Sequence, residues 1–523
     1  MMKELSLKLP PHIAYDEVEL KKFISSETGY EENRIDYLIR KRSIDARRKQ
    51  IVINVTVDVF IDEKAPSLIP EQREYQDVSN RPVVLIVGAG PAGLFAALRA
   101  VELGFKPIVF ERGKDVRERR RDLAAINKHD IVNPESNYCF GEGGAGTYSD
   151  GKLYTRSKKR GDIMRILEIL VAHGARENIL YEAHPHIGTN KLPPLVAELR
   201  NSILKAGGEI HFNTRVTDFI IDNERMRGVV TASGKSYEGI GVVLATGHSA
   251  RDIFSILNNK GVDIEFKPFA LGVRIEHEQT LIDSMQYNAK DRGEYLPPAA
   301  YSIKTQVDLK TGRYGVFSFC MCPGGFIVPS ATAPGEQVVN GMSPSRRDGR
   351  YANSGMVVTV SDHDLDAYKE FGALKGMMFQ AEVEKKAFES GGNTQKAPAQ
   401  RMIDFVNKKT TASLKDTSYQ PGLVSADLRD YLPEFVAESL RKGFLNFKRK
   451  MPSYFTNNAQ LIGVESRTSS PVRIPRDKES LEHVRIRAFY PCGEGAGYAG
   501  GIMSAAMDGE RCVEKLIESY GSK

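Results

Sequence analysis

One strand–turn–helix pattern constrains the fold of this chain more than any other feature. Residues 83–87 form a continuous apolar run, and residues 88–93 read Gly-Ala-Gly-Pro-Ala-Gly before a helix-forming segment. The next apolar run, residues 107–110, ends at Glu111 and Arg112. A buried strand, a glycine turn, a helix and a second strand ending in an acid that accepts hydrogen bonds from ribose make up a dinucleotide-binding βαβ unit. The pattern therefore favours a nucleotide site over a strand–helix turn without a ligand.

The residues of the turn have separate physical roles in such a unit. Gly88 permits the tight turn after the strand, and Gly90 omits the side chain that would separate a pyrophosphate from the backbone. Gly93 lets the helix pack closely against the sheet. Pro91 and Ala92 open the helix, whose N-terminus offers unpaired N–H groups to phosphate.

A second strand, glycine loop and helix follow near the end of the sequence, over residues 489–507. This stretch resembles the C-terminal flavin motif of glutathione-reductase-type FAD proteins, in which an acid after a strand-ending glycine binds the ribityl chain. Gly493 and Glu494 occupy these two positions, where aspartate is the commoner acid. The resemblance implies that the helix beginning near Gly501 points its N-terminus at the flavin ring, where it stabilises the negative charge of the reduced flavin.

Two further features of that superfamily lie between these stretches. Residues 240–247 form an apolar strand that ends in Ala-Thr-Gly. An earlier strand begins with Val216, at the position whose backbone contacts adenine in the superfamily. Three motifs in superfamily order favour FAD over NAD as the ligand of the first site.

Residues 140–153 are the most glycine-dense stretch in the first third of the chain. In FAD proteins with a single Rossmann unit, the corresponding loop passes close to the pyrophosphate and the isoalloxazine. Backbone N–H groups of Gly143 and Gly144 are therefore expected to bind phosphate or the flavin edge, with a flexible surface loop as the alternative. The residues expected to bind FAD are Gly88, Gly90, Pro91, Ala92, Gly93, Glu111, Arg112, Gly143, Gly144, Val216, Thr246, Gly247, Gly493, Glu494, Gly500, Gly501 and Ile502.

Four stretches together resemble a family of bacterial FAD-dependent dehydrogenases of undetermined substrate: residues 141–153, 322–325, 463–473 and 493–507. The resemblance extends over nearly the full length of the chain. It implies an N-terminal ferredoxin-like module, a glutathione-reductase-type FAD fold and an FAD-dependent C-terminal region. The family brings no established reaction to this chain.

We expect an α/β fold with a split Rossmann-type FAD-binding domain of three layers (ββα), an inserted α+β substrate domain and a small N-terminal ferredoxin-like α+β module. Only one strong Rossmann fingerprint is present. Any NAD(P)H that reduces the flavin must therefore bind without a dedicated Rossmann domain. The predicted boundaries are 1–62 for the N-terminal module, 63–81 for a linker, 82–265 for the first part of the FAD-binding domain, 266–455 for the substrate or cap region and 456–523 for the C-terminal part of the FAD-binding domain.

Composition limits the classes of protein that fit. Of 523 residues, 27% are charged, and no apolar run approaches the length of a membrane-spanning helix, about 18–20 residues. The first residues lack the apolar segment of a secretory signal, and five cysteines do not make a disulfide framework in so long a chain. We expect a cytoplasmic protein without membrane contact. Its oligomeric state stays open.

Charge is the one feature that points toward nucleic acid. The formal net charge of +6 is modest for this size. Residues 40–49 contain six basic residues and one acid. Such a run can bind a polyanion, but it is more often a solvated hairpin or turn, and the surrounding module is rich in acids. We favour the hairpin, and the run leaves open a flavin-dependent RNA-modifying enzyme, for which RNA retention at low salt is required.

Few side chains outside the glycine motifs are candidates for chemistry. His248 follows the Ala-Thr-Gly strand and is a candidate acid or base, although a helix cap or a phosphate contact is the favoured interpretation. Cys320 and Cys322 are a candidate dithiol, and no second Cys or His pair completes a zinc set, so no metal is expected. Arg467 and Arg473 are candidate anchors for an anionic substrate, with surface salt bridges as the alternative.

The combined interpretation is an FAD-dependent oxidoreductase that transfers a hydride between an organic small-molecule substrate and bound flavin. Because flavin performs the hydride chemistry itself, no side chain has a strong claim to be catalytic. NAD(P)H is a candidate transient reductant. The alternatives are the RNA-modifying enzyme and a non-catalytic FAD-binding redox sensor.

Overall fold

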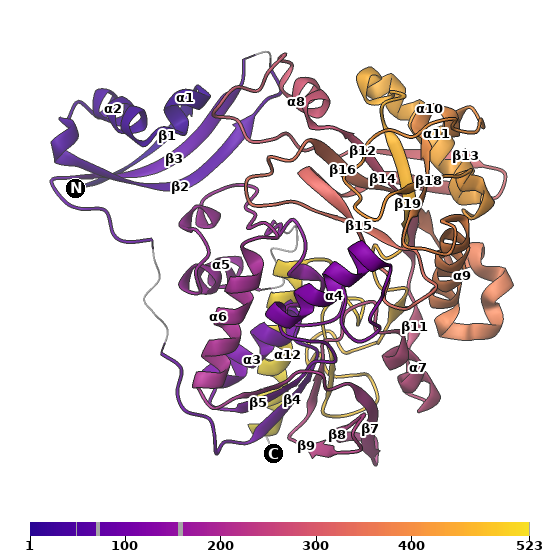
Figure 1. The fold of residues 1–523 in the computed structure, drawn as a ribbon. Coiled ribbons are helices and arrows are strands. Elements are labelled where there is room, and N and C mark those ends of the chain that lie inside the picture. Colours follow the sequence, from indigo (N-terminus) through magenta and orange to yellow (C-terminus); the bar gives the residue numbers. More distant parts are fainter. Residues whose placement is uncertain (49, 69–73, 155–160, 522–523) are drawn as a thin grey trace.

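Figure 1 shows the computed structural model of the chain, which describes residues 1–48, 50–68, 74–154 and 161–521. A parallel sheet with its helices lies at the bottom of the view and contains the glycine motifs from both ends of the sequence. A larger sheet with helices of its own, here called the upper sheet (β12–β19), lies above it. The N-terminal module lies at the upper left.

The glycine motifs meet in a five-stranded parallel sheet of order β21-β10-β4-β5-β6. The predicted strand of the first motif is β4, at the centre, and β5 beside it ends directly before Glu111. Strand β21 of the C-terminal motif pairs with β10, so segments far apart in the sequence complete one sheet. The predicted βαβ unit is confirmed. The strands are β4 (Val83–Val87), β5 (Lys106–Phe110), β6 (Glu209–His211), β10 (Val242–Leu244) and β21 (Phe489–Pro491).

Alternate side chains of β4 enter different layers. Val84 and Ile86 belong to an apolar cluster with the helices, whereas Leu85 and Val87 belong to a cluster with a β-meander and one helix on the opposite face. A strand covered on both faces is apolar throughout because its successive side chains alternate between the faces. The helical layer is α3 (Pro91–Glu102), α5 (Ile163–Ala172), α6 (Leu192–Lys205) and α12 (Ile502–Gly521); the opposite layer is β7 (Val216–Asp222), β8 (Arg225–Thr231), β9 (Ser236–Glu238) and α7 (Arg251–Asn259).

The segment between β10 and β21 is built on the eight-stranded upper sheet, of order β13-β14-β16-β12-β19-β17-β18 with β15 paired to β14. Its central pairs are antiparallel, and only β17 with β18 forms a parallel pair among the described strands of this sheet. The strands are β12 (Phe269–Glu278), β13 (Lys304–Leu309), β14 (Gly312–Pro329), β15 (Val339–Met342), β16 (Tyr351–Val360), β17 (Ala397–Arg401), β18 (Leu423–Ser425) and β19 (Gln460–Glu465).

The remaining elements surround these two sheets. Strands β11 (Glu265–Phe266) and β20 (Val472–Arg473) form a small ladder of their own. The other helices are α4 (Val116–His129), α8 (Gln279–Tyr287), α9 (Lys375–Ser390), α10 (Met402–Val406) and α11 (Glu434–Lys450), and the 3₁₀ helices are η1 (Glu32–Arg34), η2 (Gly144–Gly146), η3 (Glu177–Leu180), η4 (Asp362–Leu374), η5 (Leu428–Asp430) and η6 (Pro452–Tyr454). Among the described residues, none of the helices combines the length and the apolar character that crossing a membrane requires.

The N-terminal segment forms a three-stranded antiparallel sheet of order β1-β3-β2 with two helices. Asp16 caps the longer helix by accepting hydrogen bonds from the backbone N–H groups of Val18 and Glu19, at 3.0 Å each. The described residues of this segment run β-α-α-β-β, so the complete βαββαβ order of a ferredoxin-like module is not confirmed. The elements are β1 (Met2–Leu9), α1 (Pro11–Ala14), α2 (Glu17–Thr28), β2 (Ile35–Asp45) and β3 (Val52–Ile61).

The basic run of residues 40–49 begins within β2 and continues into the turn before β3. Three of its arginines are paired inside the chain: Arg40 with Asp58 at 2.8 Å, Arg42 with Glu182 at 2.6 Å and Arg47 with Asp45 at 2.6 Å. The second pair joins the N-terminal module to the segment before α6. The last residue of the run lies outside the described residues. These pairs favour the hairpin interpretation over a surface reserved for a polyanion.

Candidate functional site

A cavity of about 410 Å³ lies at the carboxyl ends of the parallel strands, between this sheet and the upper sheet. Ligand sites of open α/β sheets are expected at this edge. Four predicted residues, Gly93, Gly143, Cys322 and Arg473, are not in the cavity wall. The predicted residues that line it are Gly88, Gly90, Pro91, Ala92, Glu111, Arg112, Gly144, Val216, Thr246, Gly247, His248, Cys320, Arg467, Gly493, Glu494, Gly500, Gly501 and Ile502.

Two helix N-termini open on this cavity. Ala92 and Ile502, in the first turns of α3 and α12, both line it. The first N–H groups of each helix have no intrahelical partner, and each N-terminus has a positive partial charge that favours an anion. A Cβ at Gly90 would meet only the Cα of Gly144, at 3.9 Å, and a Cβ at Gly500 would meet nothing within 4 Å. The exposed backbone fits the pyrophosphate of a dinucleotide such as FAD.

The Glu111 carboxylate links three loops of the site by hydrogen bonds. The buried carboxylate accepts hydrogen bonds from the backbone N–H groups of Ala89 at 3.0 Å, Gly113 at 2.8 Å and Gly141 at 2.9 Å. A carboxylate has about four lone-pair positions, so one acceptor position is left for the expected ribose contact. Glu111 is therefore an organiser of the site as well as a candidate ligand.

The backbone N–H groups of Gly143 and Gly144, which were expected to face phosphate, already donate to carbonyl oxygens of the chain. The N–H of Gly143 donates to the carbonyl oxygen of Ala89 at 2.8 Å, and the N–H of Gly144 donates to that of Gly141 at 2.8 Å. Gly143 adopts a left-handed φ of +75°, and a Cβ there would lie 1.8 Å from Thr147 Oγ1. The expectation that both amides face the ligand is wrong, because the loop uses them for its own turn and for its contact with the first glycine motif.

Gly93 lies outside the cavity wall and has a packing role. A Cβ at Gly93 would lie 1.8 Å from the carbonyl oxygen of Gly88. This glycine permits the close packing of α3 on the β4 turn, the physical role predicted for it, without being part of the wall.

Glu494 follows β21 and lines the cavity, and a Cβ at the preceding Gly493 would lie 3.1 Å from the Cβ of Ala92 in the first motif. Burial raises the pKa of Glu494 to about 7, although the Lys267 ammonium opposes the shift. The carboxyl group therefore holds a proton at Oε over the acidic range and releases it near neutral pH.

This titration predicts a specific effect of Glu494→Gln on the protein without ligand. The native state keeps the Glu494 proton to about pH 7, whereas an unfolded glutamate loses its proton near pH 4.3. The contribution of this group to stability is thus complete below about pH 4.3 and is lost as the pH rises to about 7. Glu494→Gln should flatten the fall in unfolding free energy over this interval in urea titrations. The exposed variant Glu479→Gln should keep the wild-type slope, and an unchanged slope in Glu494→Gln would contradict the assignment.

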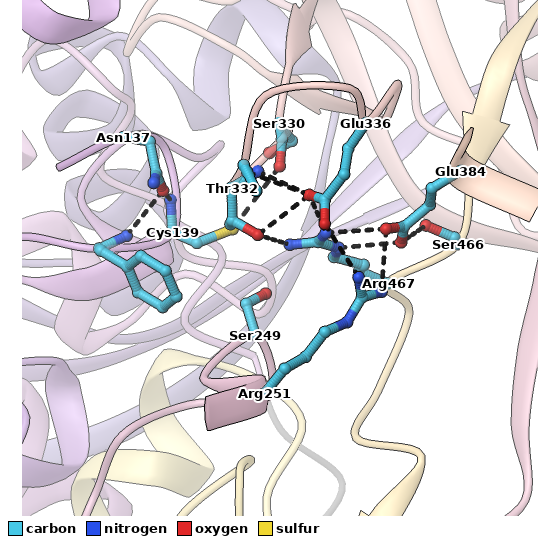
Figure 2. Close-up of polar contacts among 12 residues, drawn as sticks. Asn137, Cys139, Ser249, Arg251, Ser330, Thr332, Glu336, Glu384, Ser466 and Arg467 are labelled. Carbon is cyan, nitrogen blue, oxygen red and sulfur yellow. Dashed lines mark hydrogen bonds and ion pairs between the residues drawn. The ribbon is translucent and has the colours of Figure 1, made fainter. Parts of the chain in front are cut away.

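Figure 2 shows a network of four buried or half-buried charges, of which Arg467 lines the cavity. Arg467 Nη2 lies 2.7 Å from Glu336 Oε2 and 2.9 Å from Glu384 Oε2. Arg251, the first residue of α7, lies 3.0 Å from Glu336 and 2.9 Å from Glu384. Burial raises the pKa of Glu384, but the Arg251 and Arg467 charges outweigh burial and hold it at about 2. Two cations thus balance two carboxylates.

The network changes the expectation for the two candidate anion anchors. Arg467 lines the cavity, but Nε, Nη1 and Nη2 already donate to Glu384, Thr332 and Glu336. Arg473 is exposed and is not part of the wall. The anion-anchor prediction is therefore wrong for Arg473 and is weakened for Arg467, whose guanidinium is satisfied by protein acceptors.

His248 lines the cavity beside this network. Its Nδ1 lies 3.1 Å from Ser249 Oγ. The helix-cap interpretation is wrong, because the N-cap position of α7 is Ala250 and no side chain caps it. Burial, aided by the Arg467 and Arg251 charges, lowers the pKa of His248 to about 4, so the imidazole is neutral at pH 7.

The sequence did not single out several polar residues of the wall. They come from the end of the glycine-rich loop and from strand β15 of the upper sheet: Asp150, Lys152 and Asn340. A signal existed for Asp150 and Lys152, which continue the loop predicted to face the flavin. Asn340 had no local signal, since only tertiary pairing brings it to the cavity.

A group of possible metal ligands lies behind β21. Ligand atoms of Cys492, Asp508 and Cys512 lie within 4.8 Å of one another. Both oxygens of Asp508 are already paired with Arg476, at 2.6 and 3.0 Å. The guanidinium occupies the place of a cation, so this cluster offers no open metal site.

Two family models match the chain. Residues 268–468 match the model described as FAD-dependent protein, C-terminal domain-like, and residues 1–60 match a domain of unknown function. An uncharacterized protein from Clostridium beijerinckii is 41% identical over 507 residues, covering 93% of each chain. The chain belongs to the same family as this protein. Within that family, the upper sheet is the part that the FAD-dependent model describes.

Other proteins match either a short part of the chain or most of it at low similarity. A thiamine thiazole synthase from Aeropyrum pernix is 31% identical over 151 residues, which cover 29% of this chain and 43% of that protein. The solved glycine oxidase from Geobacillus kaustophilus aligns with 84% of this chain and 95% of its own at 12% identity, with a TM-score of 0.35. A flavin-dependent brominase, Bmp2, aligns with 84% of this chain and 79% of its own at 13% identity, with a TM-score of 0.37. These scores support no argument about the reaction.

Proposed function

We propose that this chain is an FAD-dependent oxidoreductase that transfers a hydride between a small organic substrate and bound flavin. The observation that supports the proposal most is the shared cavity of the two glycine motifs. Helices α3 and α12 both begin there, and Glu111 and Glu494, which follow β5 and β21, lie in its wall. The match of residues 268–468 to an FAD-dependent family model favours FAD as the dinucleotide.

The residues of the chain have distinct tasks in this proposal. FAD supplies the hydride chemistry when bound. The α3 N-terminus and Gly90 bind the pyrophosphate, and Glu111 accepts from a ribose hydroxyl. Glu494 holds a proton at Oε up to about pH 7, and His248 presents a neutral imidazole to the cavity. Both groups are placed to hold or move a proton beside a substrate.

The cofactor assignment is tested with the visible spectrum of the purified protein and with FAD titration of the apoprotein. Gly90→Leu should abolish FAD binding, because its side chain would enter open cavity space without a clash at Cβ. Gly521→Leu, at the exposed end of α12 where a Cβ meets nothing within 4 Å, is the matched control and should bind FAD like the wild type. A wild-type protein that never binds FAD would overturn the proposal.

Anaerobic addition of NADH or NADPH to the FAD-loaded protein then tests the reductant. Bleaching within seconds by one of them identifies a reductase. Persistent colour instead points to a substrate that is itself the electron donor. A flavin that no small reductant or substrate reduces favours the redox sensor, and salt-dependent retention of RNA favours the RNA-modifying enzyme.

A further inference from the structure

Strand β14 is interrupted by a β-bulge at the two cysteines of its middle. Phe319 pairs with Gly355 and Cys322 pairs with Asn353, so three steps along β14 oppose two along β16. Cys320, the residue after Phe319, has a left-handed φ of +43°. Non-glycine residues in this region are strained and concentrate at functional sites.

The bulge gives the two thiols different surroundings. Cys320 is half-buried and lines the cavity, whereas Cys322 is fully buried behind it. Cys322 Sγ donates to the carbonyl oxygen of Cys320 at 3.3 Å, and each thiol acts more strongly than any other group on the ionisation of its neighbour. Closing a disulfide requires the two sulfurs to approach to about 2 Å.

Positive charge surrounds this pair. The Lys152 ammonium donates to the carbonyl oxygen of Met321, between the two cysteines. Arg274 is fully buried and donates to the carbonyl oxygen of Cys320 at 2.7 Å and to Cys322 Sγ at 3.6 Å. A buried guanidinium next to a thiol stabilises the thiolate.

Nearby acids do not cancel this charge. Asp150 is held in a bidentate pair by Arg347, at 2.9 and 2.5 Å, and lies 3.4 Å from Lys152. Glu465 is paired with Arg274 at 2.8 Å, and burial raises its pKa to about 7. Glu494 also interacts with Cys320, so three cations face three carboxyl groups, and burial leaves two of these, Glu465 and Glu494, partly protonated at neutral pH.

The ionisation of the pair follows from these contacts. The hydrogen bond from Cys322, together with the Lys152 and Arg274 charges, holds the pKa of the Cys320 thiol well below its usual range against the effect of burial. The same contact and burial raise the pKa of Cys322. The neutral imidazole of His186, whose pKa is lowered by burial, adds no charge at neutral pH.

Resting on the proposed function, we propose that Cys320 and Cys322 are a redox-active thiol pair of the flavin cavity. The Cys320 thiolate and the Cys322 thiol close a disulfide by giving two electrons and one proton to oxidised FAD, which becomes the reduced FADH⁻ anion. The S–H bond of Cys322 breaks, one S–S bond forms, and charge and hydrogen are conserved. The reverse reaction reopens the pair. The cavity thus holds a second two-electron carrier, which fits a thiol or disulfide compound as the partner substrate.

Thiol reactivity tests the pair without any flavin. In the full-length apoprotein, iodoacetamide should alkylate Cys320 at least about tenfold faster than Cys139 at pH 7, followed by mass spectrometry of each cysteine peptide. Cys139 is the internal control because it is also half-buried and lines the cavity. Lys152→Met should slow alkylation of Cys320 severalfold and leave Cys139 unchanged. Equal rates for the two cysteines would overturn the proposal.

Oxidation tests whether Cys322 is the disulfide partner of Cys320. Mild diamide treatment should remove two hydrogens from the peptide that contains both cysteines, in the wild type and in Cys139→Ser but in neither Cys320→Ser nor Cys322→Ser. Anaerobic mixing of the reduced protein with FAD should then bleach the flavin and form the same disulfide. If FAD binds and the disulfide never forms, the thiol-pair proposal fails while the proposed function stands. If FAD does not bind, the proposed function fails. The alkylation and diamide results then still show whether Cys320 and Cys322 form a redox-active thiol pair.

Discussion

Replacement of Glu111 by alanine is expected to abolish FAD binding and to lower the free energy of unfolding by about 3–5 kcal/mol. The carboxylate accepts from the N–H groups of Ala89, Gly113 and Gly141, and alanine would leave three buried donors without this acceptor. Each unpaired buried donor costs about 1–3 kcal/mol, with partial relief from water. Urea unfolding followed by circular dichroism measures the loss, and FAD titration measures the affinity.

Two variants make this result specific. Glu111→Gln keeps one carbonyl acceptor but directs an NH₂ group toward an N–H donor, so it should fall between the wild type and Glu111→Ala in both measurements. Glu238→Ala, on an exposed position of β9, should match the wild type. A Glu111→Ala protein that keeps wild-type stability and binds FAD would show that the three loops hold their positions without this carboxylate.

The parts of the site that were predictable from sequence are those with a local pattern. The β4–α3 turn, the acid after β5 and the glycine loop before α12 each need fixed residue types at short spacing. Gly93 illustrates the reason: its nearest obstacle is the carbonyl oxygen of Gly88, five positions earlier. A constraint that close along the chain leaves a readable signature, so the β4–α3 turn was predicted correctly.

The parts that failed depend on contacts between distant segments. Arg467 was a candidate anchor for an anionic substrate, with surface salt bridges as the alternative, and nothing near it in the sequence indicates Glu384 or Glu336 as its buried partners. The amides of Gly143 and Gly144 were expected to be open, because their hydrogen-bond partners are visible only in the folded loop. The left-handed backbone of Cys320 is likewise a product of β14–β16 pairing that no local pattern encodes.

The second large effect is expected for Glu384, the fully buried carboxylate between Arg251 and Arg467. Glu384→Ala should lower the free energy of unfolding by about 3–5 kcal/mol, because removing one partner of a buried ion pair leaves the other charge uncompensated. The substitution should weaken the contact between α7, which covers the parallel sheet, and α9, because Arg251 is the first residue of α7 and Glu384 lies in α9. Limited proteolysis and urea unfolding measure it.

The pH dependence of this loss has a defined sign. The pKa of Glu384 is held at about 2 in the native state, below the value near 4.3 of an unfolded glutamate. Its stabilisation is therefore complete above about pH 4.3 and is lost as the pH falls toward about 2. The wild type should lose stability more steeply than Glu384→Gln over this interval. Equal slopes would show that Glu384 does not carry the charge assigned to it.

A double-mutant cycle separates the ion pair from simple loss of packing. Arg251→Met removes one cation and keeps most of the aliphatic length of the side chain. If the two charges stabilise each other, Arg251→Met should cost less in the Glu384→Gln background than in the wild type, with a coupling energy of about 1–3 kcal/mol. Arg467 still pairs with Glu336 in both backgrounds, so it contributes equally and cancels. Additive losses would mean that Arg251 and Glu384 stabilise the fold through packing alone.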